Sequence, residues 1–310
     1  MHKETTITIP VKTGGRCATV EAEVKKMKYV ERFEFPDVDF EEQFINGIKR
    51  TCYDTYYPFR TFTYRLEQLD FTEPVTILYG ENGSGKSTAL NVLAQKLNLT
   101  RDAVFNQSNF YSDYVAACEV TALKELPAAS RIITSDDVFE YLLNIRSLNA
   151  GIDEKRETLF EEFLDVKYSD FKYRTMADYD ELKRVNKARR KTQSKFVRSE
   201  LMDNVPSYSN GESAFLYFTE KITENALFIL DEPENSLSPK RQKELAKFIE
   251  DAARFFGCQI VMATHSPFLL AIKGAKIYDF DGEPISVKKW TELENVRLYY
   301  EFFMAHQGEF

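Results

Sequence analysis

The chain has 310 residues, of which 43% are hydrophobic and 29% are charged, and its formal net charge is −8. This length excludes a small disulfide-stapled scaffold, and the composition argues against wholesale disorder. The acidic excess argues against a protein that coats nucleic acid with its whole surface, although it leaves room for a local basic patch.

The cysteines and the apolar runs predict an intracellular setting. No C-x-x-C pair occurs, so we expect neither a zinc site nor a disulfide framework, and a reducing cytoplasm fits best. The polar N-terminal start and apolar runs of at most five residues predict neither a secretion signal nor a membrane span. The four cysteines are Cys17, Cys52, Cys118 and Cys258.

The first hundred residues have a β-rich pattern. Residues 5–11, 18–24 and 29–35 carry β-branched or aromatic residues in partial alternation, and 74–79 is a short apolar run typical of a buried strand. The spacing of apolar residues after Lys86 predicts a helix to about Leu97.

From about residue 136 to 203 the sequence becomes charged, with helical periodicity. It predicts one helix around residues 139–145 and another around 159–164. Strand patterns then return at 226–230, 259–263 and 276–280, separated by helical stretches such as 239–256. Strands that alternate with helices imply a mostly parallel sheet covered by helices.

We therefore predict an α/β fold with a mostly parallel sheet, an N-terminal antiparallel β portion and an inserted helical lobe. Because no repeat or linker appears, residues 1–310 are interpreted as one composite domain. Its portions are a β portion with a phosphate loop over 1–100, a mainly helical lobe over 101–206, and a C-terminal α/β portion over 207–310.

The strongest motif is a full match to G-x-x-x-x-G-K-S between Gly80 and Thr88, placed after a predicted strand and before a predicted helix. Glycines let successive backbone N–H groups face phosphate oxygens, and the start of the helix adds its positive dipole end. Lys86 is expected to reach the β- and γ-phosphates, and Ser87 to ligate Mg²⁺. The residues assigned to phosphate binding are Asn82, Gly83, Ser84, Gly85, Lys86, Ser87 and Thr88.

The second motif is the apolar strand at 226–230, which ends in Asp231 and Glu232. In an open parallel sheet, ligands lie beyond the carboxyl ends of the strands, where this pair emerges. Asp231 is expected to hold Mg²⁺, and Glu232 to act as the general base toward water.

Ser209, Gly211 and Glu212 open a predicted helix upstream of Asp231, and His265 follows the strand at 259–263. In this order the motifs resemble those of ATP-binding-cassette (ABC) ATPases, whose signature is L-S-G-G-Q or L-S-G-G-E. The resemblance implies that Ser209, Gly211 and Glu212 cap the γ-phosphate of ATP held by an opposite subunit. It also implies that His265 senses that phosphate.

The match to that family has departures. Asn210 replaces a signature glycine, Tyr208 replaces the leucine, and Ser238 stands where transport-type cassettes have an aspartate. The resemblance therefore favours stand-alone predicted ATPases of the AAA-family type, related to chromosome-maintenance (SMC-like), recombination-repair and overcoming-lysogenization-defect (OLD) proteins. Gln107 is the candidate for the Mg²⁺-contacting glutamine, although a polar turn explains its segment equally well.

Two features stay open. Tyr57, Phe59 and Tyr64 are all available to stack on adenine. Residues 183–198 contain eight basic residues and no acidic one, which indicates a solvated helix face, a contact with nucleic-acid phosphates or an acidic partner. The eight are Lys183, Arg184, Lys187, Arg189, Arg190, Lys191, Lys195 and Arg198.

The resemblance implies a soluble, cytoplasmic enzyme that hydrolyses Mg·ATP in a head-to-tail dimer and drives a conformational cycle. That cycle would act on an effector protein or nucleic acid, in genome maintenance or antiviral (phage) defence. Alternatives are an ATP-binding regulatory module with little turnover, the nucleotide-binding subunit of a transporter, and a P-loop small-molecule kinase.

Overall fold

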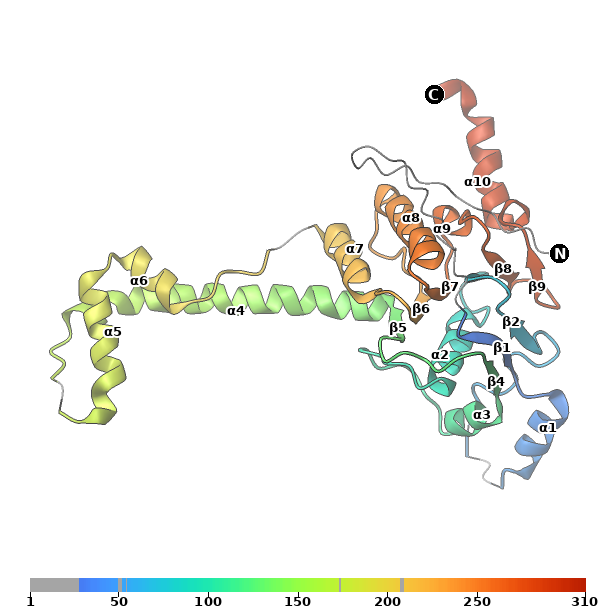
Figure 1. Cartoon of the computed structure of the whole chain (residues 1–310), viewed down its shortest axis with the longest axis horizontal. Helices are drawn as coiled ribbons and strands as arrows, with labels where there is room; N and C mark the ends of the chain where they lie inside the picture. Colours follow the sequence, from blue (N-terminus) through green and yellow to red (C-terminus); the bar gives the residue numbers. More distant parts are fainter. Residues whose placement is uncertain (1–27, 50–51, 54, 173, 207–208) are drawn as a thin grey trace, which may run out of the picture. The chain divides into compact units, whose positions relative to one another are not determined.

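The computed structural model describes residues 28–49, 52–53, 55–172, 174–206 and 209–310. The chain divides into two compact units (Figure 1). The sheet unit comprises Met1–Asp137 and Ala214–Phe310, and the helical unit comprises Val138–Ser213. The strands predicted over residues 5–11 and 18–24 lie outside the described residues.

The sheet unit contains a six-stranded sheet with the strand order β5-β6-β7-β3-β8-β9. All neighbouring strands are parallel except β8 and β9, so the prediction of a mostly parallel sheet is confirmed. Every residue of β3 and of β7 is buried, as expected for central parallel strands with both faces covered. The strands are β3 (Val75–Tyr79), β5 (Arg131–Thr134), β6 (Leu227–Asp231), β7 (Gln259–Ala263), β8 (Lys276–Asp279) and β9 (Ser286–Lys288).

Helices of the sheet unit bury apolar residues and expose polar ones. In α8, Ser238 caps the first turn by accepting from Arg241 N, and Pro239 occupies the first helical position. Leu245 and Ile249 of α8 are fully buried. The helices of this part of the chain, apart from two that accompany the second sheet, are α2 (Lys86–Lys96), α7 (Asn210–Lys221), α8 (Pro239–Phe255), α9 (Pro267–Leu270), α10 (Glu294–Ala305), η2 (Trp290–Glu292) and η3 (Gln307–Glu309).

A second, three-stranded antiparallel sheet has the order β2-β1-β4 and confirms the predicted antiparallel β portion. Its third strand comes from beyond residue 100, after α3. The side chains between this sheet, α1 and α3 are mainly aromatic, and Phe59 stacks on Phe44 with ring centroids 4.5 Å apart. These elements are β1 (Val30–Glu34), α1 (Val38–Gly47), β2 (Gln68–Asp70), α3 (Tyr111–Ala117) and β4 (Glu119–Ala122).

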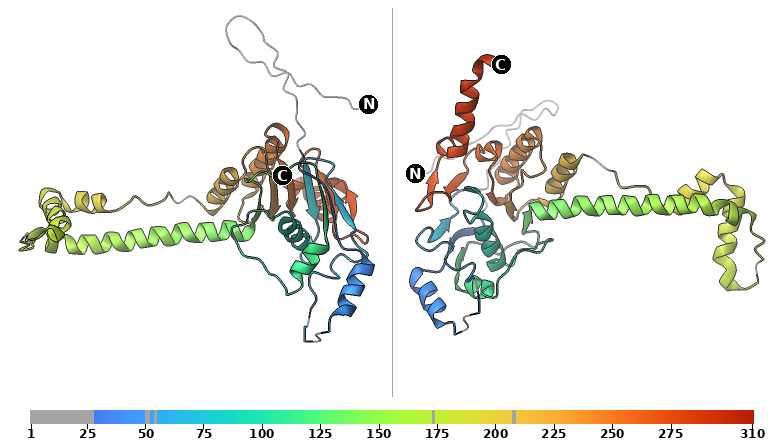
Figure 2. Two further views of the ribbon diagram at one scale, coloured as in Figure 1. Left: turned by 60° about the horizontal axis from the view of Figure 1, so that its bottom comes forward. Right: turned by 180° about the vertical axis from the view of Figure 1, so that it is seen from behind.

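The helical unit is built on α4 (Ser135–Tyr168), a continuous helix of 34 residues. The prediction of two separate helices here was wrong, because residues 146–158 contain no proline and one glycine, Gly151, which costs a helix only about 1 kcal/mol. At the C-terminal end of α4 lie η1 (Met176–Asp178), α5 (Tyr179–Arg190) and α6 (Gln193–Glu200) (Figure 2). Their shared core consists of Leu159, Phe163, Val166, Val185, Ala188, Phe196 and Val197.

No helix within the described ranges is long and apolar enough to cross a membrane.

The buried side chain of Gln259 joins the two sheets. Its Oε1 accepts from Tyr29 N (2.6 Å) and Val30 N (2.9 Å), and its Nε2 donates to Val30 O (2.8 Å). Replacing it by an apolar side chain leaves buried backbone groups without partners, at roughly 1–3 kcal/mol for each group.

We therefore expect Gln259→Leu to lower the free energy of unfolding by about 2–4 kcal/mol in urea titrations followed by circular dichroism. Gln95→Leu, on the exposed side of α2, is the matched control and is expected to change it by under about 0.5 kcal/mol. Equal stability of both variants would contradict this role for Gln259.

Candidate nucleotide-binding site

The loop between β3 and α2 has the conformation that its glycines predict. Gly85 has φ of 102°, and a Cβ there would lie 3.2 Å from the ring of Phe62. The Arg65 guanidinium donates to Ser84 O (3.3 Å) and Phe280 O (2.6 Å). Since Gly85 offers no side-chain cap to α2, the first N–H groups of that helix stay available to an anion.

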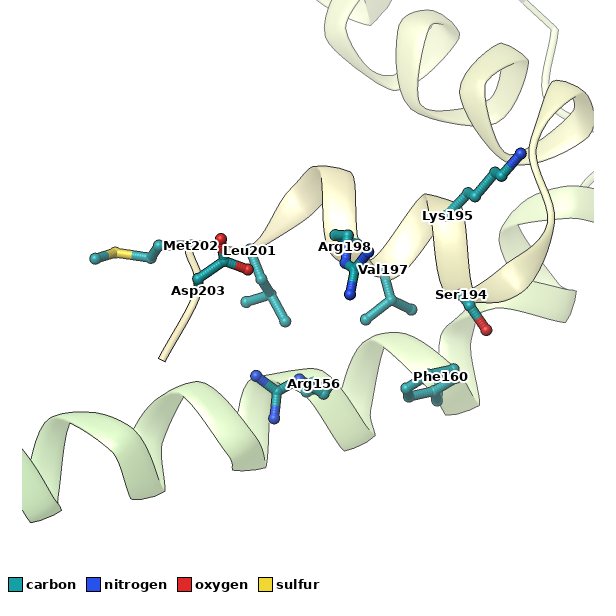
Figure 3. Close-up of a pocket in the computed structure, with 9 residues that line it drawn as sticks. All are labelled: Arg156, Phe160, Ser194, Lys195, Val197, Arg198, Leu201, Met202 and Asp203. Atoms are coloured by element: carbon teal, nitrogen blue, oxygen red, sulfur yellow. The ribbon is translucent and has the colours of Figure 1, made fainter. Parts of the chain in front are cut away.

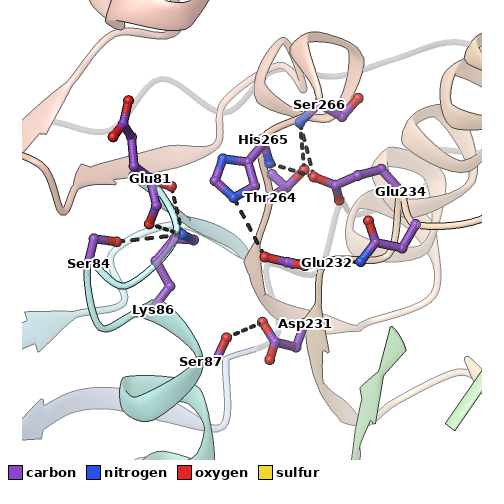
Figure 4. A network of polar contacts seen from close by, with 12 residues as sticks. Glu81, Ser84, Lys86, Ser87, Asp231, Glu232, Glu234, Thr264, His265 and Ser266 are labelled. Carbon is purple, nitrogen blue, oxygen red and sulfur yellow. Dashed lines mark hydrogen bonds and ion pairs between the residues drawn. The ribbon is translucent and has the colours of Figure 1, made fainter. Parts of the chain in front are cut away.

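The amine of Lys86 lies within the curve of this loop (Figure 4). It donates to Gly80 O (2.6 Å) and Glu81 O (2.7 Å), and the residue is only 4% exposed. Burial lowers its pKa, while the charges of Glu232 and other nearby carboxylates act in the opposite direction. Lys86 is thus a buried cation inside a phosphate-sized loop.

Asp231 ends β6 and faces the first turn of α2. Ser87 Oγ donates to Asp231 Oδ1 over 3.1 Å. Burial raises the pKa of Asp231 to about 6, and the bond from Ser87 opposes that rise. A hydroxyl and a carboxylate this close are the hard oxygen donors that suit Mg²⁺, which commonly takes one or two protein ligands together with phosphate and water. The described residues contain no cluster of three or more His, Cys, Asp or Glu that could form an all-protein metal site.

Glu232 follows Asp231 in a left-handed backbone conformation, with φ of 48°. Its carboxylate accepts from Asn235 Nδ2 (3.0 Å), and its other oxygen lies 3.6 Å from His265 Nε2. His265 and Asn235 lower the pKa of Glu232 despite its partial burial. A non-glycine residue held at positive φ is strained, which is common at functional sites.

His265 follows β7 and is fixed through its backbone. Glu234, which the sequence analysis did not single out, accepts from His265 N (2.5 Å) and Ser266 N (3.1 Å). Burial raises the pKa of Glu234. His265 Nε2 is buried, and within the described residues its polar contact is the 3.6 Å approach to Glu232 rather than a hydrogen bond.

Arg101 is a second residue that sequence reasoning missed. Its guanidinium donates to Asn91 Oδ1 (2.5 Å), one helical turn beyond Ser87, and lies 3.9 Å from the centre of the Phe105 ring. Burial lowers its pKa, and the negative charges of Asp137 and Asp231 oppose this change. The sequence pattern gives little reason to select Arg101, because a lone arginine outside any motif resembles a surface residue.

None of the contacts given above involves Ser209, Gly211, Glu212 or Gln107. Ser209, Gly211 and Glu212 belong to the helical unit, where Ser209 and Glu212 form a capping box at the start of α7. Glu212 Oε2 accepts from Ser209 N (3.2 Å) and Ser209 Oγ (3.0 Å). Gln107 is exposed in an irregular segment before α3.

The three candidate aromatics differ sharply. Phe59 is 4% exposed inside the aromatic core, so it cannot stack on a base. Tyr57 donates from its hydroxyl to Thr88 Oγ1 (3.1 Å), beside the glycine loop, whereas Tyr64 is 77% exposed.

The parallel sheet, the glycine loop and the carboxylates at the tip of β6 define a P-loop nucleotide-binding protein. A family model described as "ABC transporter" matches residues 71–235, just over half of the chain. The chain therefore belongs to the ABC family, whose ATP-binding domains generally hydrolyse ATP with Mg²⁺. A second model, described as "AAA domain, putative AbiEii toxin, Type IV TA system", matches residues 204–271.

Among curated proteins, the chain is similar to the "Uncharacterized ABC transporter ATP-binding protein YdbJ" of Bacillus subtilis (strain 168). The two are 25% identical over 189 residues, which is 61% of this chain and 51% of that protein. The chain thus spans about half the length of this relative.

Among solved structures, similar chains include an inward-facing ABC transporter of metal-chelate type, with 17% identity and a TM-score of 0.36. That match covers 76% of this chain and 80% of the other. Another is the Smc head domain of Pyrococcus furiosus bound to the C-terminal domain of ScpA, with 13% identity and a TM-score of 0.42. That match covers 88% of this chain and 99% of the other.

The raised pKa of Asp231 makes its contribution to stability depend on pH. The folded chain holds a proton on Asp231 up to about pH 6, while the ordinary value is 3.8, so folding becomes less favourable as pH rises between them. As pH rises across this interval, we expect the free energy of unfolding of Asp231→Asn to gain about 3 kcal/mol on that of the native chain, in urea unfolding without nucleotide. The gain should be constant above pH 6, and a gain independent of pH from 4 to 8 would contradict the assignment.

Proposed function

We propose that this chain is an ABC-type ATPase that binds and hydrolyses Mg·ATP between two head-to-tail copies. The observation that carries the proposal is the contact between Ser87 and Asp231, with Lys86 and Glu232 within electrostatic reach of it. These groups supply, in one place, a phosphate grip, two metal-binding oxygens and a carboxylate base.

Nucleotide binding would begin at the glycine loop. Backbone N–H groups of residues 82–88 and the amine of Lys86 would take the phosphate oxygens, since the amine already lies among the loop carbonyls. Ser87 and Asp231 would hold Mg²⁺, which supplies charge neutralisation for the phosphates when bound. Gln107 is proposed as a further contact to that ion.

Glu232 would accept a proton from the attacking water. His265 and Asn235 keep its pKa low, so the carboxylate is ionised and ready to accept at neutral pH. The ring of His265 would contact the γ-phosphate while Glu234 holds the backbone of this residue in place. Hydrolysis would remove that contact and release the dimer.

The second copy would contribute Ser209, Gly211 and Glu212 at the start of α7. A helix N-terminus is a suitable anion site. Ser209 Oγ is exposed and bonded to Glu212, so a phosphate contact requires that this bond be exchanged.

A charge-neutral substitution of the base tests the hydrolytic step. We expect Glu232→Gln to lower kcat by on the order of 10²–10⁴ while ATP binding persists, because the amide cannot accept the proton. The variant should accumulate a Mg·ATP-dependent dimer on a sizing column. Lys86→Ala is the control and should lose ATP binding. Equal, negligible turnover in native and Glu232→Gln chains would instead favour an ATP-binding regulatory module.

Mixed dimers test whether two chains share each site. Lys86→Ala and Ser209→Arg should each be inactive alone, since every homodimeric site then lacks one half. An equal mixture should recover about a quarter of native activity, because half of the dimers are mixed and each has one intact site. No recovery in ATPase assays of the mixture would overturn the head-to-tail arrangement.

The biological setting is also part of this proposal. We place the protein in the cytoplasm, with an effector protein or nucleic acid as partner, in antiviral defence or genome maintenance. The match to the AbiEii-toxin model supports the defence role. The name of the Bacillus relative supports the alternative of a transporter subunit. Ser238 caps α8 rather than offering a carboxylate, which favours the stand-alone ATPase.

A further inference from the structure

The basic residues between positions 183 and 198 fall into two sets in the helical unit. The first set, called here the paired bases, is neutralised within the unit. Lys183 lies 3.7 Å from Asp180, Arg184 2.6 Å from Glu162, and Lys187 2.5 Å from Glu200. Arg189 donates to the backbone carbonyls of Lys167 and Ser169.

The second set, called the unpaired bases, is Arg190, Lys191, Lys195 and Arg198. Their side chains make no hydrogen bond or ion pair within the described ranges, and all but the partly buried Lys191 are exposed. Lys195 and Arg198 are three positions apart on α6 and so project from neighbouring points of its surface. These four cations without an acidic partner lie within the nine residues 190–198 of an acidic chain, and this locally basic segment is called here the basic face.

A cavity of about 400 Å³ lies between α4 and α6, directly beside this face (Figure 3). Its apolar lining comes from Phe160, Val197, Leu201 and Met202. Three cations, Arg156, Lys195 and Arg198, and one acid, Asp203, also border it. Arg156 is already paired with Asp153 and Asn204. Met202 is 65% exposed at its edge, so apolar surface here remains in contact with solvent.

We propose that this face binds single-stranded nucleic acid, with phosphates on the unpaired bases and one unstacked base in the cavity. A nucleotide combines a flat apolar base with an anionic phosphate, which matches an apolar cavity bordered by cations. A duplex would use only the cations, because its bases are stacked and paired. The inference names a partner class for the proposed ATPase, but binding itself does not require ATP turnover.

The salt dependence of binding follows from the number of contacts. Four phosphate contacts to a single strand predict a slope of log K against log[salt] of about −3. The affinity at physiological salt should be modest, with Kd on the order of 10⁻⁴–10⁻⁶ M.

The test measures fluorescence anisotropy of labelled 20-nucleotide single strands, DNA and RNA, and of the matching duplex, with the full chain at several KCl concentrations. Changing all four unpaired bases to Gln should weaken single-strand binding at least about tenfold and bring the slope near zero. The control changes Lys183, Arg184 and Lys187 to Gln, and should keep the native slope to within about one. Binding by the fourfold variant equal to that of the native chain would overturn the proposal.

A second variant tests the cavity. Met202→Ala shortens an exposed apolar side chain without changing the charge, so the fold is kept, and it should weaken single-strand binding about fivefold while leaving duplex binding unchanged. Duplex binding as tight as single-strand binding, with no effect of Met202→Ala, would overturn the single-strand assignment. Binding of a labelled polyglutamate peptide but of no nucleic acid would overturn it in favour of an acidic protein partner.

The ATPase rate separates this inference from the proposed function. Without nucleic acid, the fourfold Gln variant should hydrolyse ATP at the native rate. A native chain that binds single strands but never hydrolyses ATP would contradict the proposed function alone.

Discussion

Excess negative charge is the constraint on which the candidate site depends. Asp231, Glu232 and Glu234 all act electrostatically on the buried amine of Lys86, and a triphosphate adds further negative charge to the same place. The loop N–H groups and Lys86 do not offset all of it, which is why we propose that nucleotide affinity depends on Mg²⁺ between Ser87 and Asp231. Burial raises the pKa of Asp231 while His265 lowers that of Glu232, and this difference fits one carboxylate for metal binding and the other for proton transfer.

The parallel sheet supplies this arrangement. Strands β6, β7 and β3 are neighbours, and their carboxyl ends deliver Asp231, His265 and the glycine loop to one edge. Residues far apart in sequence are therefore fixed by backbone hydrogen bonds rather than by flexible side chains alone. The sheet also holds the strained backbone of Glu232 in place, since the N–H of Glu232 donates to Ala263 O (3.0 Å) at the end of β7.

Local sequence signals predicted the central strands and the glycine loop, because apolar runs bounded by turn residues specify buried parallel strands. They did not reveal that α4 is one continuous helix. A helix end needs a stop signal and Gly151 alone is too weak to provide one, so the predicted break was wrong. Glu234 was also missed, because it acts on His265 in a segment distant in sequence, and Arg101 was missed because it stands outside any motif. The division of residues 183–198 into paired and unpaired bases likewise depends on Glu162 of α4 and Glu200 of α6, which no local spacing identifies, whereas the pair of Asp180 and Lys183 is local on α5.

The start of α4 lies in the sheet unit, beside the strand that carries Asp231. Thr134, the last residue of β5, pairs in register with Asp231, and α4 begins at the next residue. Asp137 fixes this start by accepting from Thr134 N (2.6 Å) and Ala103 N (2.5 Å). A change at Asp231 on binding Mg·ATP would therefore act beside the rigid start of a 34-residue helix. Because a packed helix turn moves as a unit rather than bending gradually, a shift of Asp231 would act first on this turn, within the sheet unit.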